Sequence, residues 1–152
     1  MSAPLHLDVR RRATGGETEM SLDVPSDLAY VGPAVELIAD QFRGGRLTLS
    51  TRRVRFNLRT ALAEALANAI AYGNRHDPHR LVRVRVEVTR LAVRVEVTDE
   101  GGGFDPAAVP DPTLPDRLER EDGRGLFVLR RLVDHVVFNA KGNSVCLTLR
   151  LQ

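Results

Sequence analysis

The sequence of 152 residues contains one cysteine, no tryptophan and one lysine, and only 5% of its residues are aromatic. A single cysteine cannot form an internal disulfide, and Cys146 lies in an apolar stretch where we expect a small buried residue. The scarcity of aromatic rings argues against a surface that stacks on nucleic-acid bases.

Long apolar runs are also missing. The first residues, MSAPLHLDVRRR, lack the apolar core of a signal peptide, and no later segment is apolar for long enough to cross a membrane. We therefore expect a cytoplasmic protein without a membrane partner.

The charge of the chain gives no strong indication of a polyanionic partner. The formal net charge is +2, and the pI of about 9.2 reflects the fact that 21 of the 22 basic residues are arginine. Arginines that alternate with valines are typical of the solvated face of a sheet, which we favour over a nucleic-acid site. Hydrophobic residues make up 43% and charged residues 28%, as in an ordinary globular domain.

Hydrophobic periodicity predicts elements in the order β-α-α-β-β-loop-α-β-β. Residues 1–18 are expected to be a flexible, frayed arm, and residues 19–152 to form one domain. Strands are predicted at 19–25, 82–88, 91–97, 136–138 and 144–151, and helices at 28–42, 52–72 and 126–133. The strands have one apolar face, which predicts an α/β (α+β) two-layer sandwich with helices on one face of a mainly antiparallel mixed sheet.

Three residues mark the predicted helix boundaries. Ser26 is the expected N-cap of the first helix, and Gly73 the expected end of the second. Pro33 lies too far inside the first helix for this cap, so it either kinks the helix or indicates a later start.

Asp99 does not fit the sheet pattern simply. The odd positions from Leu91 to Val97 share the core face, and Asp99 continues that register. Burying a polar group without a partner costs roughly 2–7 kcal/mol, and a charge costs more. Either the strand ends at Thr98 and Asp99 caps a turn, or the carboxylate has a functional partner.

Two further patterns are ambiguous when taken alone. Glu64 and Asn68 are i and i+4 on one helix face, as a general base and a metal-binding amide would be, or as ordinary exposed residues would be. Gly123 and Gly125 flank Arg124 just before a predicted helix. Free N–H groups at such a helix start can bind an anion, although many glycine-rich helix starts bind nothing.

In this order, the three patterns resemble the nucleotide-binding boxes of the GHKL (histidine-kinase-like) ATPase superfamily, which has the Bergerat fold. The matching segments are EALANAIAYGN, DEGGGFDP and GRGLFVLRRLVD, and the resemblance extends over roughly residues 20–151. It implies that Asp99 accepts a hydrogen bond from the adenine amino group and that Gly101 and Gly103 shape the adenine pocket. It also implies that the proline-rich segment 104–122 is a lid over the phosphates.

The same resemblance implies ATP and Mg²⁺ as ligands. Glu64 would polarise an incoming hydroxyl, and Asn68 would hold Mg²⁺ between the phosphates. Thr148 on the last strand would assist adenine binding, although a β-forming residue in a strand needs no such role. The residues implied at the phosphates, with Arg124 offsetting charge during transfer, are Gly123, Arg124 and Gly125.

Within the superfamily, the sequence most resembles the anti-sigma factor serine/threonine kinase branch. No phospho-accepting helical hairpin is seen before the ATP-binding boxes, no transducer domain is seen after them, and Glu64 suits activation of a hydroxyl. The branch implies an ATP-binding anti-sigma factor that phosphorylates a Ser or Thr of a STAS-type anti-anti-sigma factor. Its partners would be that protein and a sigma factor, with no nucleic acid, and members of the branch are often homodimers.

Two alternatives stay open at this point. The chain would otherwise be a regulatory module that binds ATP without phosphotransfer, or a kinase for a hydroxyl-bearing regulator unrelated to sigma factors. The presence of both Glu64 and Asn68 favours catalysis. His76 and His79 have a spacing seen in metal sites, but Pro78 and the lack of further ligands favour a solvated turn.

Overall fold

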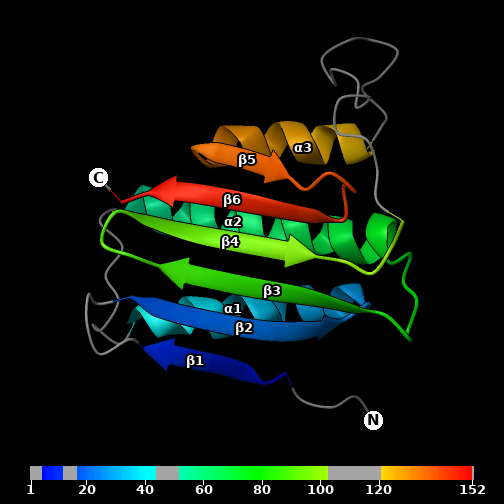
Figure 1. The fold of residues 1–152 in the computed structure, drawn as a ribbon, viewed down its shortest axis with the longest axis horizontal. Helices are drawn as coiled ribbons and strands as arrows, with labels where there is room; N and C mark the ends of the chain where they lie inside the picture. Colours follow the sequence, from blue (N-terminus) through cyan, green and yellow to red (C-terminus); the bar gives the residue numbers. More distant parts are fainter. Residues whose placement is uncertain (1–4, 12–16, 44–51, 103–120, 152) are drawn as a thin grey trace.

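The computed structural model, which describes residues 5–11, 17–43, 52–102 and 121–151, has a β-sheet in front of a layer of helices (Figure 1). α1 and α2 cover one face of the sheet, and α3 packs against α2 and β5. In chain order the elements are β1 (Leu7–Arg11), β2 (Thr18–Pro25), the 3₁₀ helix η1 (Leu28–Tyr30), α1 (Val31–Arg43), α2 (Arg52–Asn68), the π-helical segment η2 (Ala69–Gly73), β3 (Leu81–Val88), β4 (Ala92–Thr98), α3 (Glu121–Leu132), β5 (His135–Phe138) and β6 (Ser144–Arg150).

The strands form a single sheet in the order β1-β2-β3-β4-β6-β5. Within the described ranges every pairing is antiparallel, so the two-layer α+β prediction is confirmed and no parallel pair makes the sheet mixed. Val84 lies opposite Val97 and Val86 opposite Val95, which aligns the valines of neighbouring strands on the same face. This face is the one that the helices cover.

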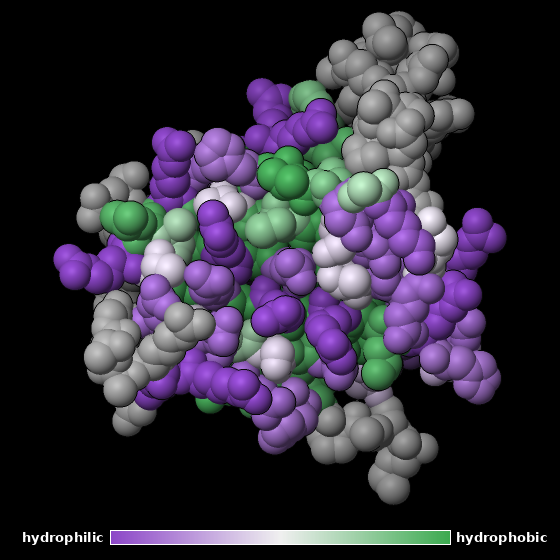
Figure 2. Space-filling view, viewed as in Figure 1, coloured by the Kyte–Doolittle hydropathy of each residue, from purple (hydrophilic) through white to green (hydrophobic). Residues whose placement is uncertain are grey.

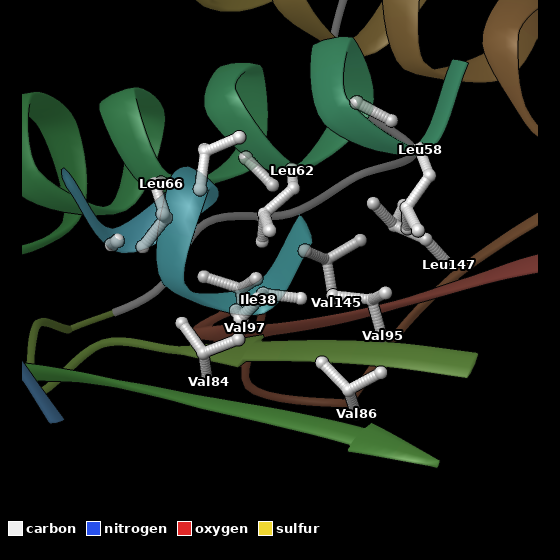
Figure 3. Close-up of a cluster of buried hydrophobic side chains, with 14 of the residues drawn as sticks. Ile38, Leu58, Leu62, Leu66, Val84, Val86, Val95, Val97, Val145 and Leu147 are labelled. Atoms are coloured by element: carbon white, nitrogen blue, oxygen red, sulfur yellow. The ribbon is translucent and has the colours of Figure 1, made fainter. Parts of the chain in front are cut away.

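The core lies between this valine face and one stripe of α2 (Figure 3). Leu58, Leu62 and Leu66 recur every four residues on α2 and point at the sheet, while Ile38 reaches it from α1. Each such side chain contributes about 1.5–3 kcal/mol when it is fully buried. Because these leucines fix how α2 is rotated, they also determine where its polar residues point.

The opposite face of the sheet is exposed and hydrophilic over much of its area (Figure 2). Arg83 and Asp23 form an ion pair of 3.1 Å across β3 and β2, of the exposed kind that contributes about 0–1 kcal/mol. This confirms the prediction of a wet arginine face. Cys146 lies on the same face and is only partly buried, so the prediction of a buried cysteine is wrong. Partial burial and the nearby Glu96 raise the pKa of its thiol.

The predicted frayed arm is wrong for residues 7–11, which form β1 and pair with β2. Leu7 and Val9 pack against the edge of the core, and this contact orders the strand. Alternation over five residues was too short to predict it from sequence. Leu91 also differs from prediction: β4 begins at Ala92, and Leu91 is 69% exposed in the turn before it.

The start of the first helix differs from the prediction in a way that explains Pro33. Asp27, not Ser26, is the cap: its carboxylate accepts the Ala29 N–H (2.9 Å) at the start of η1. α1 therefore begins at Val31, and Pro33 falls in its first turn, where no N–H is needed. The Ser26 hydroxyl instead donates to the Arg80 carbonyl (2.6 Å).

The other two helices also have unexpected boundaries. α2 changes to the π-helical segment η2 before the predicted end at Gly73, and α3 begins at Glu121 rather than at Leu126. Gly123 and Gly125 are thus inside the first turns of α3, not before it. None of the helices in the described ranges has the length and apolarity needed to span a membrane.

Candidate functional site

A cavity of about 800 Å³ lies where the end of α2, the turn after β4 and the start of β6 meet α3. Its volume is in the range of roughly 300–1,000 Å³ that is usual for small-molecule sites. Asn68, Gly73, Asp99 and Gly102 contribute to its wall. A second hollow, of about 810 Å³, lies on the charged outer face of the sheet and contains none of the predicted site residues.

Asp99 stands directly after β4, and the interpretation of this residue as a turn cap is confirmed. The strand ends at Thr98, and Asp99 Oδ1 accepts the Gly101 N–H (2.8 Å) as a turn-capping carboxylate does. The same carboxylate also lines the cavity. Within the described part of the chain no donor reaches its second oxygen, Oδ2, which leaves that atom able to accept a hydrogen bond from a ligand.

The electrostatic surroundings of Asp99 act in opposite directions. Burial raises the pKa of its carboxyl group above the ordinary value. The hydrogen bond from Gly101 and the positive charges of Lys141 and Arg80 oppose this, but burial has the larger effect. The Asp99 carboxyl group therefore holds its proton to higher pH than an ordinary aspartate does.

This raised pKa predicts a pH dependence of stability. Folding favours the protonated form, so the contribution of Asp99 to stability is fully present below its unfolded pKa, near 3.8, and is lost as pH rises through the folded pKa. The uncharged variant Asp99→Asn lacks this contribution. Urea unfolding of both proteins should be measured from acid to neutral pH. As the pH rises, the unfolding free energy of the wild type should fall relative to that of Asp99→Asn. A difference that stays constant would contradict the assignment.

Glycines allow two backbone segments, the end of η2 and the turn after β4, to meet beside Asp99. A Cβ atom added to Gly73 would collide with the Asp99 carboxylate, and one added to Gly101 would collide with the Gly73 carbonyl group. The π-helical turn brings Gly73 into this position, since the Asn74 N–H bonds to the Ala69 carbonyl five residues earlier (2.7 Å). The cavity wall is thus built by backbone packing that no larger residue permits.

We predict that Gly101→Ala destabilises the protein and that Gly102→Ala does not. The new methyl at position 101 meets a rigid backbone carbonyl, and forced overpacking typically costs about 1–3 kcal/mol. At position 102 a Cβ atom meets nothing within 4 Å, and neither glycine has a positive φ. Chemical denaturation of the two variants measures this directly. Equal unfolding free energies for the two variants would contradict the predicted packing.

Glu64 and Asn68 lie side by side where α2 passes α3. A Cβ atom at Gly125 would stand 2.5 Å from Asn68 Nδ2 and 2.7 Å from Glu64 Oε1, so these three residues are in direct proximity. Within the described ranges neither the Glu64 carboxylate nor the Asn68 amide has a hydrogen bond or ion pair. Two polar groups that face a helix start and have no partner among the described residues are arranged as groups that bind a ligand.

The remaining predicted site residues have different outcomes. Gly123 and Arg124 are in the first turn of α3, whose leading N–H groups have no partners within the helix. Gly103, most of the predicted lid and the side chain of Arg124 lie outside the described residues, so their predicted roles stay predictions. His76 and His79 are in an exposed turn, and no cluster of metal-binding side chains occurs within the described ranges.

Thr148 does not reach the cavity. On β6 the odd positions Val145, Leu147 and Leu149 are buried, so Thr148 points to the outer face of the sheet. The predicted contact with adenine is therefore wrong on geometric grounds. Asn143 and Ser144 line the cavity instead, at the start of the same strand. Their position after the turn at Lys141 and Gly142 was the available signal, because strand ends and turns often carry ligand contacts.

The fold and this arrangement of residues agree with what is found among known proteins. Residues 24–149 match the family described as Histidine kinase-like ATPase domain, and the chain belongs to this family. The resemblance inferred from the three motifs is thereby confirmed.

Curated relatives carry a more particular name. The chain is 34% identical over 90 residues to the anti-sigma F factor of Geobacillus thermodenitrificans (strain NG80-2), an alignment that covers 57% of this chain and 61% of the relative. It is 32% identical over 100 residues to the anti-sigma F factor of Oceanobacillus iheyensis, covering 62% of this chain and 68% of the relative. The chain thus spans about three fifths of the length of the first of these relatives. An ATPase domain of this type implies ATP binding.

Proposed function

We propose that this protein is an anti-sigma factor with ATP-dependent serine/threonine kinase activity toward a STAS-type anti-anti-sigma factor. One observation carries the proposal: Asn68 and Asp99 line one cavity, Glu64 lies beside Asn68 at Gly125, and neither the Glu64 and Asn68 side chains nor Asp99 Oδ2 has a partner within the described residues. Unsatisfied polar groups of this kind are usual where a ligand completes the hydrogen bonding.

The β4 end of the cavity fits an adenine ring. Asp99 Oδ2 is an acceptor for the exocyclic amino group, and Gly73 and Gly101 keep the space beside it free of side chains. Val97 and Leu129 provide apolar wall for the faces of the ring. We assign base recognition to this end.

The α3 end fits the phosphates. The free N–H groups and the positive dipole end of a helix favour an anion, and the α3 start lies beside Asn68. The Asn68 amide oxygen would hold Mg²⁺ there together with phosphate oxygens, since Mg²⁺ prefers oxygen ligands. When bound there, Mg²⁺ would neutralise negative charge that develops on the phosphates during transfer.

The proposed reaction needs a base beside the γ-phosphate, and we assign this role to Glu64, which lies beside Asn68 and Gly125. The Glu64 carboxylate takes the proton of the incoming Ser or Thr hydroxyl, and that oxygen forms a bond to the γ-phosphorus. The bond between the γ-phosphorus and the bridging oxygen breaks, leaving ADP.

The proposed partners rest on the names of the relatives. Those proteins are called anti-sigma F factors, and we propose that this chain likewise captures a sigma factor in the cytoplasm. Phosphorylation of the STAS protein would stop it from releasing that sigma factor. A homodimer is also proposed, in keeping with the kinase branch that the sequence resembles.

The test is a phosphotransfer assay with purified protein, Mg-ATP and STAS-domain proteins of the same genome, read by intact mass. One added phosphate on a STAS protein is the expected result. Binding of ATP without transfer to any STAS protein would support the alternative of a non-catalytic module. No binding of ATP at all would overturn the proposal.

A further inference from the structure

Asn74 is a buried and hydrogen-bonded polar side chain in the wall of the cavity. It follows η2 directly and is only 1% exposed. Its Nδ2 donates to Ser26 Oγ (3.0 Å) and to the Leu81 carbonyl (3.1 Å), while its Oδ1 accepts the Glu100 N–H (2.8 Å). One buried amide therefore ties together the ends of η2, β2 and β4 and the start of β3, and it has a single satisfied orientation.

The hydrogen bond from the Glu100 N–H to Asn74 Oδ1 holds the turn that contains Asp99, the residue to which we assign base recognition. Glu100 follows Asp99, so this bond holds the peptide group next to Asp99 from the α2 side. From the β6 side, the Asp99 N–H donates to the Asn143 carbonyl (2.9 Å), and Asn143 Nδ2 donates to the Asp99 carbonyl (3.0 Å). The backbone of the turn is clamped between two asparagines on different elements.

Asn74 also adjoins the close contact between Gly73 and Asp99. The absent Cβ of Gly73 is what leaves space for the Asp99 carboxylate. A shift of Asn74 would move Gly73 with it, because the two residues are consecutive. Hence the same short segment sets both the backbone and the side chain of Asp99.

We propose that Asn74 is a positioning residue for base recognition, which holds the Asp99–Gly101 turn so that Asp99 Oδ2 faces an amino group at a fixed depth in the cavity. This inference rests on the proposed nucleotide site. Guanine has a carbonyl oxygen where adenine has this amino group, and a carboxylate attracts the amino group and repels the carbonyl. The position of Asp99 therefore determines discrimination between the two bases, whereas the phosphates are held elsewhere.

The experiment compares Asn74→Ala with a matched control, Ser26→Ala. The control removes the hydroxyl that accepts from Asn74 and donates to Arg80, but it leaves the bond to Glu100 in place. Affinities for ATP and for GTP are measured by titration calorimetry with Mg²⁺, alongside urea unfolding. We expect Asn74→Ala to weaken ATP binding by about 10- to 100-fold, as small misplacements of a binding group do, with a much smaller effect on GTP.

The ratio of the two affinities separates positioning from simple loss of stability. Ser26→Ala should be less stable than the wild type but keep its ratio of ATP to GTP affinity. Asn74→Ala should be less stable and should also have a lower ratio. Asn74→Ser repeats the test with a smaller, still polar side chain, so that a folded variant is available. An unchanged ratio in the folded Asn74 variants, or an equal drop in Ser26→Ala, would overturn the inference alone. Failure of the wild-type protein to bind ATP would overturn the proposed function and this inference with it.

Discussion

Replacing Asp99 by asparagine should reduce ATP binding by at least about 100-fold while the fold is kept. The asparagine Oδ1 can still accept the Gly101 N–H, so the turn after β4 is retained. The asparagine Nδ2 then takes the place of the carboxylate Oδ2. Its N–H groups face those of the adenine amino group, so two donors meet and no acceptor remains. A hydrogen bond to a charged group contributes about 1.5–3 kcal/mol, and the new donor–donor contact adds to this loss.

Two measurements make this prediction specific. Titration calorimetry with Mg-ATP gives the affinity, and urea unfolding shows whether the variant is folded. Asp23→Asn removes the same charge from the outer face of the sheet and should bind ATP like the wild type. If Asp99→Asn binds ATP as tightly as the wild type, Asp99 does not recognise the base, and the main support for the nucleotide site is lost.

The alternation of small apolar and charged residues made the sheet predictable. From Val82 to Val88 a period of two leaves only one face on which every valine can be buried, so the buried face follows from the local pattern. β1 was missed because Leu7 and Val9 are too few to establish a period. The early start of α3 was missed because Gly123 and Gly125 have low helix propensity, which packing of Leu126 and Leu129 outweighs.

The candidate site was predictable only where a motif has fixed spacing along the chain. Glu64 and Asn68 are one helical turn apart, and Asp99 and Gly101 form a local turn, so sequence alone relates the members of each pair. Asn74 looks like an ordinary turn residue because its partners Glu100 and Ser26 are 26 and 48 positions away. Such long-range bonds depend on the sheet order.

Thr148 illustrates the opposite error. Thr148 does lie on the last strand, as predicted. Successive residues of a strand point to opposite faces of the sheet, and the even-numbered residues of β6 point away from the helices. Only the strand's first residues, where the chain leaves the turn at Gly142, come near the cavity. The apolar residues Val145, Leu147 and Leu149 alternate with Thr148 in the sequence, so the alternation alone would have placed Thr148 on the other face.

The second large effect is expected from Glu64→Gln, which should leave ATP binding nearly intact and slow phosphotransfer by about 100- to 10,000-fold. That is the usual contribution of a positioned general base. Glutamine keeps the size of the side chain beside Asn68 and Gly125 but cannot take the hydroxyl proton. The loss should appear in kcat, with little change in the KM for ATP, because the proton is transferred only in the transition state.

A matched variant distinguishes loss of the base from loss of charge. Glu96→Gln makes the same change on the exposed outer face of β4 and should transfer phosphate at the wild-type rate. Single-turnover transfer to the STAS protein, with ATP affinity measured in parallel, gives the two quantities separately. Equal rates for Glu64→Gln and the wild type would place the base elsewhere or show that the transfer needs none. Weak ATP binding in Glu64→Gln would instead assign Glu64 to ground-state binding of Mg-ATP, because a residue that acts only as base contributes nothing before the hydroxyl arrives.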